Sequence, residues 1–454
     1  MEDSNHNLDI FKPEFFNSFI KALENNNSKI LLAKIRDFHP SEIAYYIQTL
    51  NEFHRKKLLK LLEKDLDGKV LVELEPAFLE KIINEIDLKI IKKAVNELDS
   101  DEAASIIELL NFENKNRILS EISKKDRSFI EDNLSYKDNT AGRLMQKEVV
   151  KVLYSFDVGD TIDYLRKSKS LPSVFYDIFL VDQNDRFIGM IPLCTIVSNI
   201  RSKKISSIIK KQNSSVHFSI DQEDVADIFR KRNLTSIAVV DDEDRLLGMI
   251  NVDDVVDVID DEAEEDILKL AGVVGDQNFY DAIISITKAR FTWLFFNLIA
   301  AFIATYVITN FENTIEKLAV LAAIMPIVAS MGGCSGTQSL TTAVRAIAMK
   351  HLTWSNALRS TGKELVIGFL NGILFSILSF FITYIWFDDY VLSTVISVSL
   401  LFNLVFGSFF GTFVPIILTR VGVDPAIASG TFVTTLTDIM GFFIFLSLAS
   451  LYLI

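Results

Sequence analysis

Cysteine and basic residues are both scarce in this chain of 454 residues. The two cysteines, Cys194 and Cys334, lie far apart, so the sequence holds neither a disulfide framework nor a paired CxxC zinc motif. The 46 Lys and Arg residues are outnumbered by 60 Asp and Glu residues, which gives a formal net charge of −14. Nucleic acids attract basic surfaces, so this composition argues against nucleic acid as a partner and suits cations.

Several catalytic signatures are also missing. The sequence contains no glycine-rich phosphate loop, no HExxH and no GxSxG, and its five histidines show no metal-ligand or triad spacing. We therefore expect a protein that is neither an enzyme nor an ATP-driven pump. The N-terminus lacks the basic segment and apolar run of a signal peptide, so we expect residues 1–289 to stay in the cytoplasm.

Long apolar runs fill the C-terminal part. Residues 290–454 carry seven basic and seven acidic side chains, so the excess of acid belongs to residues 1–289. About 20 apolar residues can span a bilayer. Five segments qualify as spans: Phe291–Phe311, Leu318 to about Met349, Leu365–Phe387, Val391–Thr419 and Ala426–Ile454. Basic residues between the spans fall on the side of residues 1–289, which predicts a multi-pass protein of the cell membrane with its N-terminus cytoplasmic and its C-terminus outside.

Residues from about 10 to 135 have the pattern of short amphipathic helices joined by polar turns. Phe38–Leu50 (FHPSEIAYYIQTL) aligns with Leu98–Leu110 (LDSDEAASIIELL), with Glu, Ala and aliphatic residues at the same places. We expect Ser41 and Asp101 to cap the two helices. The recurrence predicts an all-α helical-repeat domain.

A second repeat follows. Phe179–Ile191 (FLVDQNDRFIGMI) matches Ala238–Ile250 (AVVDDEDRLLGMI). Each copy predicts a buried strand, an acidic turn and a second strand, and helices are expected at Asp160–Arg166 and Gln222–Arg232. This β-turn-β-α pattern resembles a tandem of CBS modules, which pair into one α/β unit, over roughly Ala141–Asp260.

Nine carboxylates crowd into the fourteen residues Asp253–Asp266 (DDVVDVIDDEAEED). Apolar residues at helical spacing predict a helix that leads toward the membrane part. Asp254, Asp257, Asp261 and Glu265 fall near one face, where they repel one another, and no Lys or Arg lies within the stretch. Bound divalent cations would screen this repulsion; the alternative is a solvated acidic linker helix.

Asp438 is the sharpest polar signal in the membrane part. It lies fourteen residues beyond Asp424, about 21 Å along a helix, within a hydrocarbon layer about 30 Å thick. A carboxylate at that depth normally faces a polar cavity or an ion path, and the alternative is pairing with a polar group of a neighbouring helix. The same helical face carries further candidate pore-lining residues: Thr431, Thr434, Thr435 and Gly441. Such an oxygen-lined face suits Mg²⁺, a hard cation usually held by one or two carboxylates and waters.

A second candidate lining segment is Met331–Gln338 (MGGCSGTQ), inside a predicted span. Gly333 and Gly336 permit close helix approach. Gln338 adds polar atoms that need partners in an apolar layer. A pore lining and a helix-packing face both remain open for this segment.

With these modules in order, and with Asp424–Gly441 (DPAIASGTFVTTLTDIMG) closing the chain, the sequence resembles the MgtE family of Mg²⁺ transporters. The resemblance implies a homodimeric, Mg²⁺-gated channel of five spans per subunit, which takes up Mg²⁺ down its electrochemical gradient. Its partners would be the lipid bilayer, a second copy and a divalent cation. Asp438 would be the ion-binding pore residue, between the second and fifth helices.

The resemblance also implies a sensor. High internal Mg²⁺ would bridge the acidic helix, acting as a plug, to the CBS modules and the N-domain, and would hold the pore shut. The matching metal ligands are Asp221, Glu223, Asp254, Asp257, Glu262, Glu265 and Asp266, with Asp101 in the N-domain. The expected domains are a helical-repeat N-domain (1–137), tandem CBS modules (138–258), a connecting or plug helix (259–286) and a five-helix transmembrane domain (287–454).

The sequence departs from the family pattern in places. Cys334 stands where Asn is usual, and a soft thiol does not favour Mg²⁺. Gly430 and Thr431 stand where Asn or Pro is common. Asn251 stands where the nucleotide-binding pattern of CBS modules has a hydroxyl residue. The sequence therefore meets only half of the pattern that would bind ATP at the CBS pair. Two alternatives stay open: transport of Co²⁺, Ni²⁺ or Mn²⁺, and a non-conducting membrane-anchored metal sensor.

Overall fold

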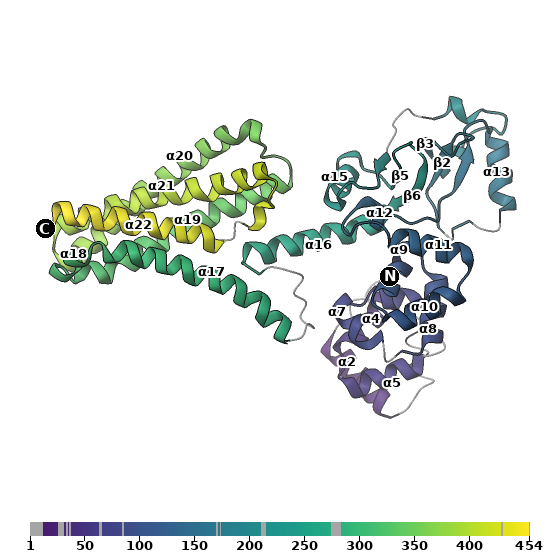
Figure 1. Cartoon of the computed structure of the whole chain (residues 1–454), viewed down its shortest axis with the longest axis horizontal. Coiled ribbons are helices and arrows are strands. Elements are labelled where there is room, and N and C mark those ends of the chain that lie inside the picture. The colour runs from purple at the N-terminus through teal and green to yellow at the C-terminus, as the bar shows by residue number, and fades with distance from the viewer. Residues whose placement is uncertain are drawn as a thin grey trace. The chain divides into compact units, whose positions relative to one another are not determined.

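The computed structural model describes residues 12–25, 31–32, 35, 38–62, 66–83, 86–168, 171–172, 174–209, 215–273, 283–427 and 430–453 (Figure 1). The chain divides into two compact units, Met1–Asp260 and Asp261–Ile454. Each unit is described by itself.

The first unit begins with an all-α domain, as the repeat predicted. Its helices are α2 (Pro13–Glu24), α4 (Pro40–Thr49), α5 (Glu52–Leu62), α6 (Gly68–Val72), α7 (Pro76–Ile82), α8 (Leu88–Glu97), α9 (Ser100–Glu108), α10 (Phe112–Glu121) and α11 (Lys124–Asn133). Helices α4 and α9, which the alignment pairs, start in the same way. The backbone N–H of His39 donates to Glu42 at 2.8 Å, and that of Asp99 donates to Glu102 at 3.3 Å. This return bond belongs to a capping box, so the two copies share local structure as well as sequence.

The predicted caps were wrong by two residues. His39 and Asp99 are the N-cap residues of α4 and α9, whereas Ser41 and Asp101 lie inside the first turn. The cause is the capping box itself, because the glutamate three residues on selects the N-cap position. The carboxylate of Asp101 is therefore left free of a capping role.

The CBS modules form two three-stranded sheets with the same topology. The strands are β1 (Lys151–Leu153), β2 (Asp177–Val181), β3 (Phe187–Pro192), β4 (Ser215–His217), β5 (Ser236–Val240) and β6 (Leu246–Asn251). In each sheet the first strand is parallel to the second and the third is antiparallel to it. The helices are α12 (Ala141–Leu144), which contacts β4 and α15, α13 (Val158–Lys167), α14 (Leu193–Val197), the short 3₁₀ helix η3 (Ile205–Ser207) and α15 (Gln222–Arg232). The tandem repeat and both predicted helices are confirmed.

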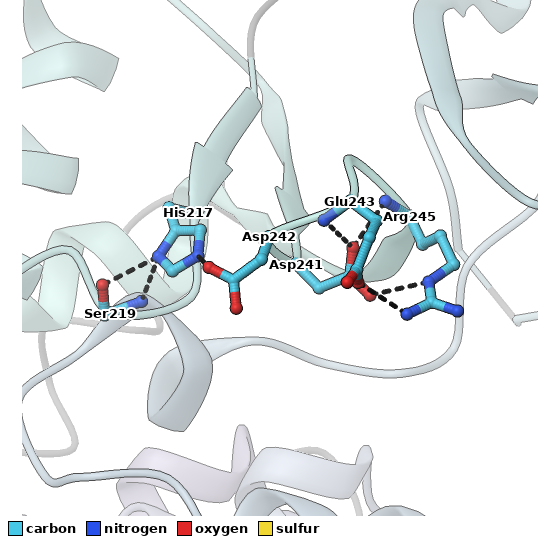
Figure 2. Close-up of polar contacts among 6 residues, drawn as sticks. All are labelled: His217, Ser219, Asp241, Asp242, Glu243 and Arg245. Carbon is cyan, nitrogen blue, oxygen red and sulfur yellow. Dashed lines mark hydrogen bonds and ion pairs between the residues drawn. The ribbon is translucent and has the colours of Figure 1, made fainter.

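The acidic turns of the two modules are alike in detail. Asp182 accepts the N–H groups of Asn184 and Arg186 at 2.7 and 2.9 Å. Asp241 accepts those of two residues at the matching places, Glu243 and Arg245, at 3.0 and 2.8 Å (Figure 2). The first Asp of each repeat therefore stabilises the turn in which it lies. The acidic turn with its Asp-Arg pair has a structural role in both modules.

Beside this second turn, His217 of β4 contacts Ser219 and Asp242, with ring nitrogens 2.8 and 3.0 Å from the two side-chain oxygens (Figure 2). The two turns also bond to each other across the pair. The N–H of Phe187 donates to Asp244 at 2.8 Å, and that of Leu246 donates to Asp185 at 3.0 Å. These reciprocal bonds join the modules.

Helix α16 (Val252–Leu270) contains the whole acidic stretch and follows β6 directly. Its first residues belong to the first unit and those from Asp261 to the second. Residues 274–282, in the range predicted for the connecting segment, lie outside the described residues.

Five helical segments in the described part of the second unit are long and apolar enough to cross a membrane, as predicted. They are α17 (Ile283–Thr309), α19 (Val320–Ala348), η4 with α20 (Trp354–Phe387, of which α20 is Ala357–Phe387), α21 (Tyr390–Val421) and α22 (Gly430–Tyr452). Helix α18 (Glu312–Lys317) joins the first two. The first span starts before the predicted Phe291. The last starts at Gly430 rather than Ala426, because Pro425–Ile427 form a separate 3₁₀ turn, η5.

Helix α21 is the centre of this bundle and contacts α19, α20 and α22 (Figure 1). Small residues let α19 and α21 approach closely: a Cβ built on Gly407 would lie 2.6 Å from the carbonyl oxygen of Gly332. Serine hydroxyls add bonds between the helices, as Ser335 donates to the carbonyl of Leu404 at 3.2 Å. Small residues and interhelical hydrogen bonds are the usual means of packing helices in lipid.

Candidate ion pathway and acidic clusters

Asp438 lies in the middle of α22 and is partly buried. Within the described part of the chain it makes no ion pair and no side-chain hydrogen bond. The alternative expectation, a partner on a neighbouring helix, finds no support among these residues. An intramembrane carboxylate without a protein partner needs water or a cation.

The threonines on the approach to Asp438 are oriented by their own helix. The hydroxyl of Thr434 donates to the carbonyl of Gly430 at 2.6 Å, and that of Thr435 donates to Thr431 at 2.9 Å. A hydroxyl that has given its proton to the backbone presents only lone pairs to its surroundings. These oxygens are therefore acceptors, which suits a hydrated cation.

The candidate glycines of α19 pack against α22. A Cβ on Gly333 would lie 2.9 Å from the methyl group of Thr434, and one on Gly336 would lie 2.7 Å from Val433. Both glycines are buried within the subunit. Their contacts favour the helix-packing interpretation, because both glycines let α19 pack closely against α22.

The other face of α19 is polar and uncovered. Cys334, Thr337, Gln338 and Thr341 recur at helical spacing, and all four are exposed in this single chain. A polar stripe along a membrane span is costly in lipid and normally faces protein or water. Gln338 thus lies on the uncovered side of the helix, away from the buried glycines.

An acidic cluster joins α9 to the start of α16. The Oδ1 atom of Asp101 is buried and has no hydrogen-bond partner among the described residues. Burial, together with the charge of Asp254, raises the pKa of Asp101 well above its ordinary value. Burial and the charge of Asp253 raise the pKa of Asp254 to about 7, and Glu102 adds to the effect. The cluster has an excess of negative charge that a cation would neutralise.

Two members of this cluster, Asp99 and Glu102, were missed in the sequence. Burial is the first cause of the raised pKa of each, and the charges of neighbouring acids follow. Their spacing is typical of a capping box. Because that local role explained both residues, nothing in the sequence indicated that they also lie beside α16. Asp101 and Asp254, which were both predicted, are brought together.

The end of α16 contacts the membrane part of the second unit. Leu270 packs against an apolar cluster formed by Leu340, Val344, Ala426 and Val433. These residues belong to the C-terminal half of α19, to η5 and to the first turn of α22. The end of the acidic helix therefore covers the ends of the two helices that carry the candidate pore residues.

Lys269 adds an ionic contact at the same place. Its Nζ lies 2.6 Å from Oδ2 of Asp424 and also pairs with Glu265. Burial alone would lower the pKa of Lys269, but the two carboxylates raise it. Burial and the charge of Asp424 raise the pKa of Asp266. Lys269 was missed because its partner Asp424 is 155 residues away in the sequence.

The remaining predicted ligands are dispersed. Asp221 is the N-cap of α15 and accepts the N–H of Glu223 at 2.9 Å. Partial burial of the Asp257 carboxylate, followed by the charge of Asp253, raises its pKa. Glu262 is partly buried on α16. Among the residues that the structure describes, no three His, Cys, Asp or Glu side chains are placed to hold one metal ion. The predicted sensor set is thus not assembled as a single site.

Comparison with known proteins identifies the family. Three family profiles match: the MgtE intracellular N domain at residues 38–139, the CBS domain at residues 205–261 and the MgtE divalent cation transporter domain at residues 325–448. The chain is also 32% identical over 441 residues to the magnesium transporter MgtE of Thermus thermophilus, which covers 96% of this chain and 98% of that one. The chain belongs to the MgtE family.

Other MgtE proteins are similar too. The magnesium transporter MgtE of Enterococcus faecalis is 32% identical over 324 residues, which cover 71% of each chain. A crystal structure of the cytosolic domain of the Mg²⁺ channel MgtE in complex with ATP is 26% identical and covers 54% of this chain and 99% of that one, with a TM-score of 0.49. As an MgtE protein, the chain combines the helical N-domain, a CBS pair and a transmembrane bundle of five candidate spans.

Proposed function

We propose that this MgtE protein is a Mg²⁺ channel that takes up Mg²⁺ down its electrochemical gradient and is closed by Mg²⁺ at its acidic cytoplasmic domains. The carrying observation is Asp438, a carboxylate in mid-span without a protein partner among the described residues. Thr434 and Thr435 direct acceptor oxygens along the same helix. Mg²⁺ keeps several of its waters, so one carboxylate and a few acceptors suffice to pass it.

The uncovered face of α19 supports a homodimer. Two copies that meet along Cys334, Thr337, Gln338 and Thr341 would enclose these polar groups around a shared axis and remove them from lipid. In that arrangement Gln338 and Cys334 line the pathway, and Gly333, Gly336 and Gly441 support it from behind.

The acidic cluster at Asp101 and Asp254 is the proposed sensor. Without a cation, its carboxylates repel or take up protons, as the pKa of about 7 for Asp254 indicates. A bound Mg²⁺ would neutralise the pair and hold α9 against α16. Asp221, Glu223, Asp257, Glu262, Glu265 and Asp266 are proposed as further ligands that close in when Mg²⁺ binds.

The packing of Leu270 and Lys269 supports the plug role of α16, because the helix end already covers the start of α22. The proposed domains remain 1–137, 138–258, 259–286 and 287–454. The topology, with the N-terminus cytoplasmic and the C-terminus outside, agrees with the cation–π contact of Arg420 and Trp354 at 4.1 Å, which brings two predicted cytoplasmic connections together.

ATP is a further proposed ligand of the CBS pair. Asn251, which departs from the nucleotide pattern, uses its backbone N–H to bind Asp254 at 3.2 Å. A nucleotide there would lie next to the sensor cluster. Equilibrium binding of ATP to the purified protein, with and without Mg²⁺, tests this ligand.

Uptake of Mg²⁺ into proteoliposomes containing the purified protein tests the transport proposal. An inward Mg²⁺ gradient should load the vesicles, and Co²⁺, Ni²⁺ or Mn²⁺ should compete weakly. Vesicles that stay empty would instead support a non-conducting metal sensor. Preferred uptake of one of the other ions would support the alternative of a Co²⁺, Ni²⁺ or Mn²⁺ transporter. The exposed thiol of Cys334 is the feature that favours this alternative.

A further inference from the structure

Asn403 is a buried amide at the junction of three membrane helices. It belongs to α21 and is 0% exposed. Its Nδ2 donates to the carbonyl of Val328 in α19 at 2.7 Å. Its Oδ1 is buried and has no partner among the residues that the structure describes. One side of this amide is therefore fixed, and the other has no partner in the described part of the chain.

Two glycines make the slot in which this amide lies. A Cβ on Gly332 of α19 would lie 2.6 Å from Cγ of Asn403, and one on Gly441 of α22 would lie 2.9 Å from the same atom. Any larger residue at either place would displace the amide. Asn403 is thus inserted between α19 and α22 and contacts the backbone of both.

This slot lies at the level of Asp438. Gly441 follows Asp438 by three residues, about one helical turn. On the other side, Thr434 precedes it by four residues and touches Gly333, the neighbour of Gly332. Helix α19 therefore contacts α22 both before and after the carboxylate, and the amide of Asn403 occupies one of the two contacts.

A buried amide with an unmet acceptor is costly, by comparison with an apolar side chain of the same size. Packing alone does not explain its presence. A planar amide is thin enough to lie between two glycine backbones, and its bond to Val328 fixes its orientation. A branched aliphatic side chain with the same number of heavy atoms is thicker and makes no such bond.

We propose that Asn403 is a positioning residue for cation selection: its amide sets the spacing of α19 and α22 at the level of Asp438. The inference rests on the proposed conduction past Asp438. Mg²⁺ tolerates little departure from its small octahedral shell, whereas Ca²⁺ accepts longer and more variable distances. A wider spacing should therefore raise the passage of Ca²⁺ relative to Mg²⁺.

The test compares the ratio of Ca²⁺ to Mg²⁺ uptake in proteoliposomes of the full chain. Asn403→Leu keeps the number of side-chain heavy atoms but is thicker than the planar amide, so it should push α19 and α22 apart. We expect the ratio to rise about fivefold, in line with the lower end of the cost of an overpacked contact. Gly441→Ala forces a methyl group against the amide and should raise the ratio too. Adding Asn403→Ala to it makes room again and should return the ratio toward wild type.

Gly362→Ala is the matched control, because no atom of the described residues lies within 4 Å of a Cβ at that glycine. A purely structural role would lower both uptakes together and leave the ratio unchanged. If Asn403→Leu does not reconstitute, Gly441→Ala is measured by the same criterion. An unchanged ratio in the variant measured, with uptake abolished by Asp438→Asn, overturns this inference alone. Wild-type uptake by Asp438→Asn would overturn the proposed function and the inference with it.

Discussion

The raised pKa of Asp254 makes the proposed Mg²⁺ sensor dependent on pH. The pKa of Asp254 rises from 3.8 to about 7, mainly because of burial and then because of the charge of Asp253. Because the folded value is the higher one, the carboxyl's contribution to stability is complete below pH 3.8 and is lost as the pH rises through about 7. The shift corresponds to at most about 4 kcal/mol against the ionised form. A bound cation would offset this cost.

Protons and Mg²⁺ should therefore compete at this carboxylate. A group with a pKa of about 7 is ionised in about one molecule in ten at pH 6 and in about nine in ten at pH 8. The Mg²⁺ concentration that gives half-maximal protease protection of the cytoplasmic domains should then be about tenfold higher at pH 6 than at pH 8.

Limited proteolysis of the full chain across a Mg²⁺ series at the two pH values measures this. Asp254→Asn should weaken protection and remove most of its pH dependence. Glu113→Gln, an exposed residue in the first turn of α10, is the control and should behave as wild type. Equal half-protection concentrations at both pH values in the wild-type protein would refute the reasoning.

Three further predictions concern the membrane unit. Lys269→Met removes the ion pair with Asp424. In a flux assay, the Mg²⁺ concentration needed to close the channel should then rise by about fivefold, the equivalent of about 1 kcal/mol. An unchanged concentration would exclude a role of Lys269 in closure. Gly336→Ala should lower the melting temperature of the detergent-solubilised protein, since a Cβ there would lie 2.7 Å from Val433. The control Gly362→Ala should leave the melting temperature unchanged. Equal melting temperatures for the two variants would contradict the close packing of α19 against α22 at Gly336. Cys334→Ser should reduce competition of Co²⁺ with Mg²⁺ uptake, because a hydroxyl is a harder ligand than a thiol, and unaltered competition would remove Cys334 from the pathway.

The modules were predictable because each has a periodic or local signal. The spans follow from continuous apolar length, and the CBS pair follows from two turns in which Asp182 and Asp241 fold their own loops. Asp438 stood out because a charge in an apolar run is visible without knowing its neighbours. Its oxygen-bearing threonines share its helix, so helical spacing alone placed them together.

The features that the sequence did not reveal depend on contacts between distant segments. Asn403 is one polar residue among many in α21. Only its close contacts with Gly332 of α19 and Gly441 of α22 show that its amide lies between these two helices. Lys269 meets Asp424 across 155 residues. The cap of α9 was misplaced because Asp101 is also a good capping residue, and the reciprocal bond between Asp99 and Glu102 decides between them. That choice leaves the Asp101 carboxylate free for the acidic cluster.

Mg²⁺ uptake by Asp438→Asn in proteoliposomes tests the central claim most directly. Asn keeps the size of the side chain and removes its charge and one of its two acceptor oxygens. Asp388→Asn makes the same change at an exposed residue after α20. We predict that uptake by Asp438→Asn falls by at least about tenfold, the loss of about 1.4 kcal/mol or more of ion stabilisation, and that Asp388→Asn retains wild-type uptake. Wild-type uptake by Asp438→Asn would contradict the account.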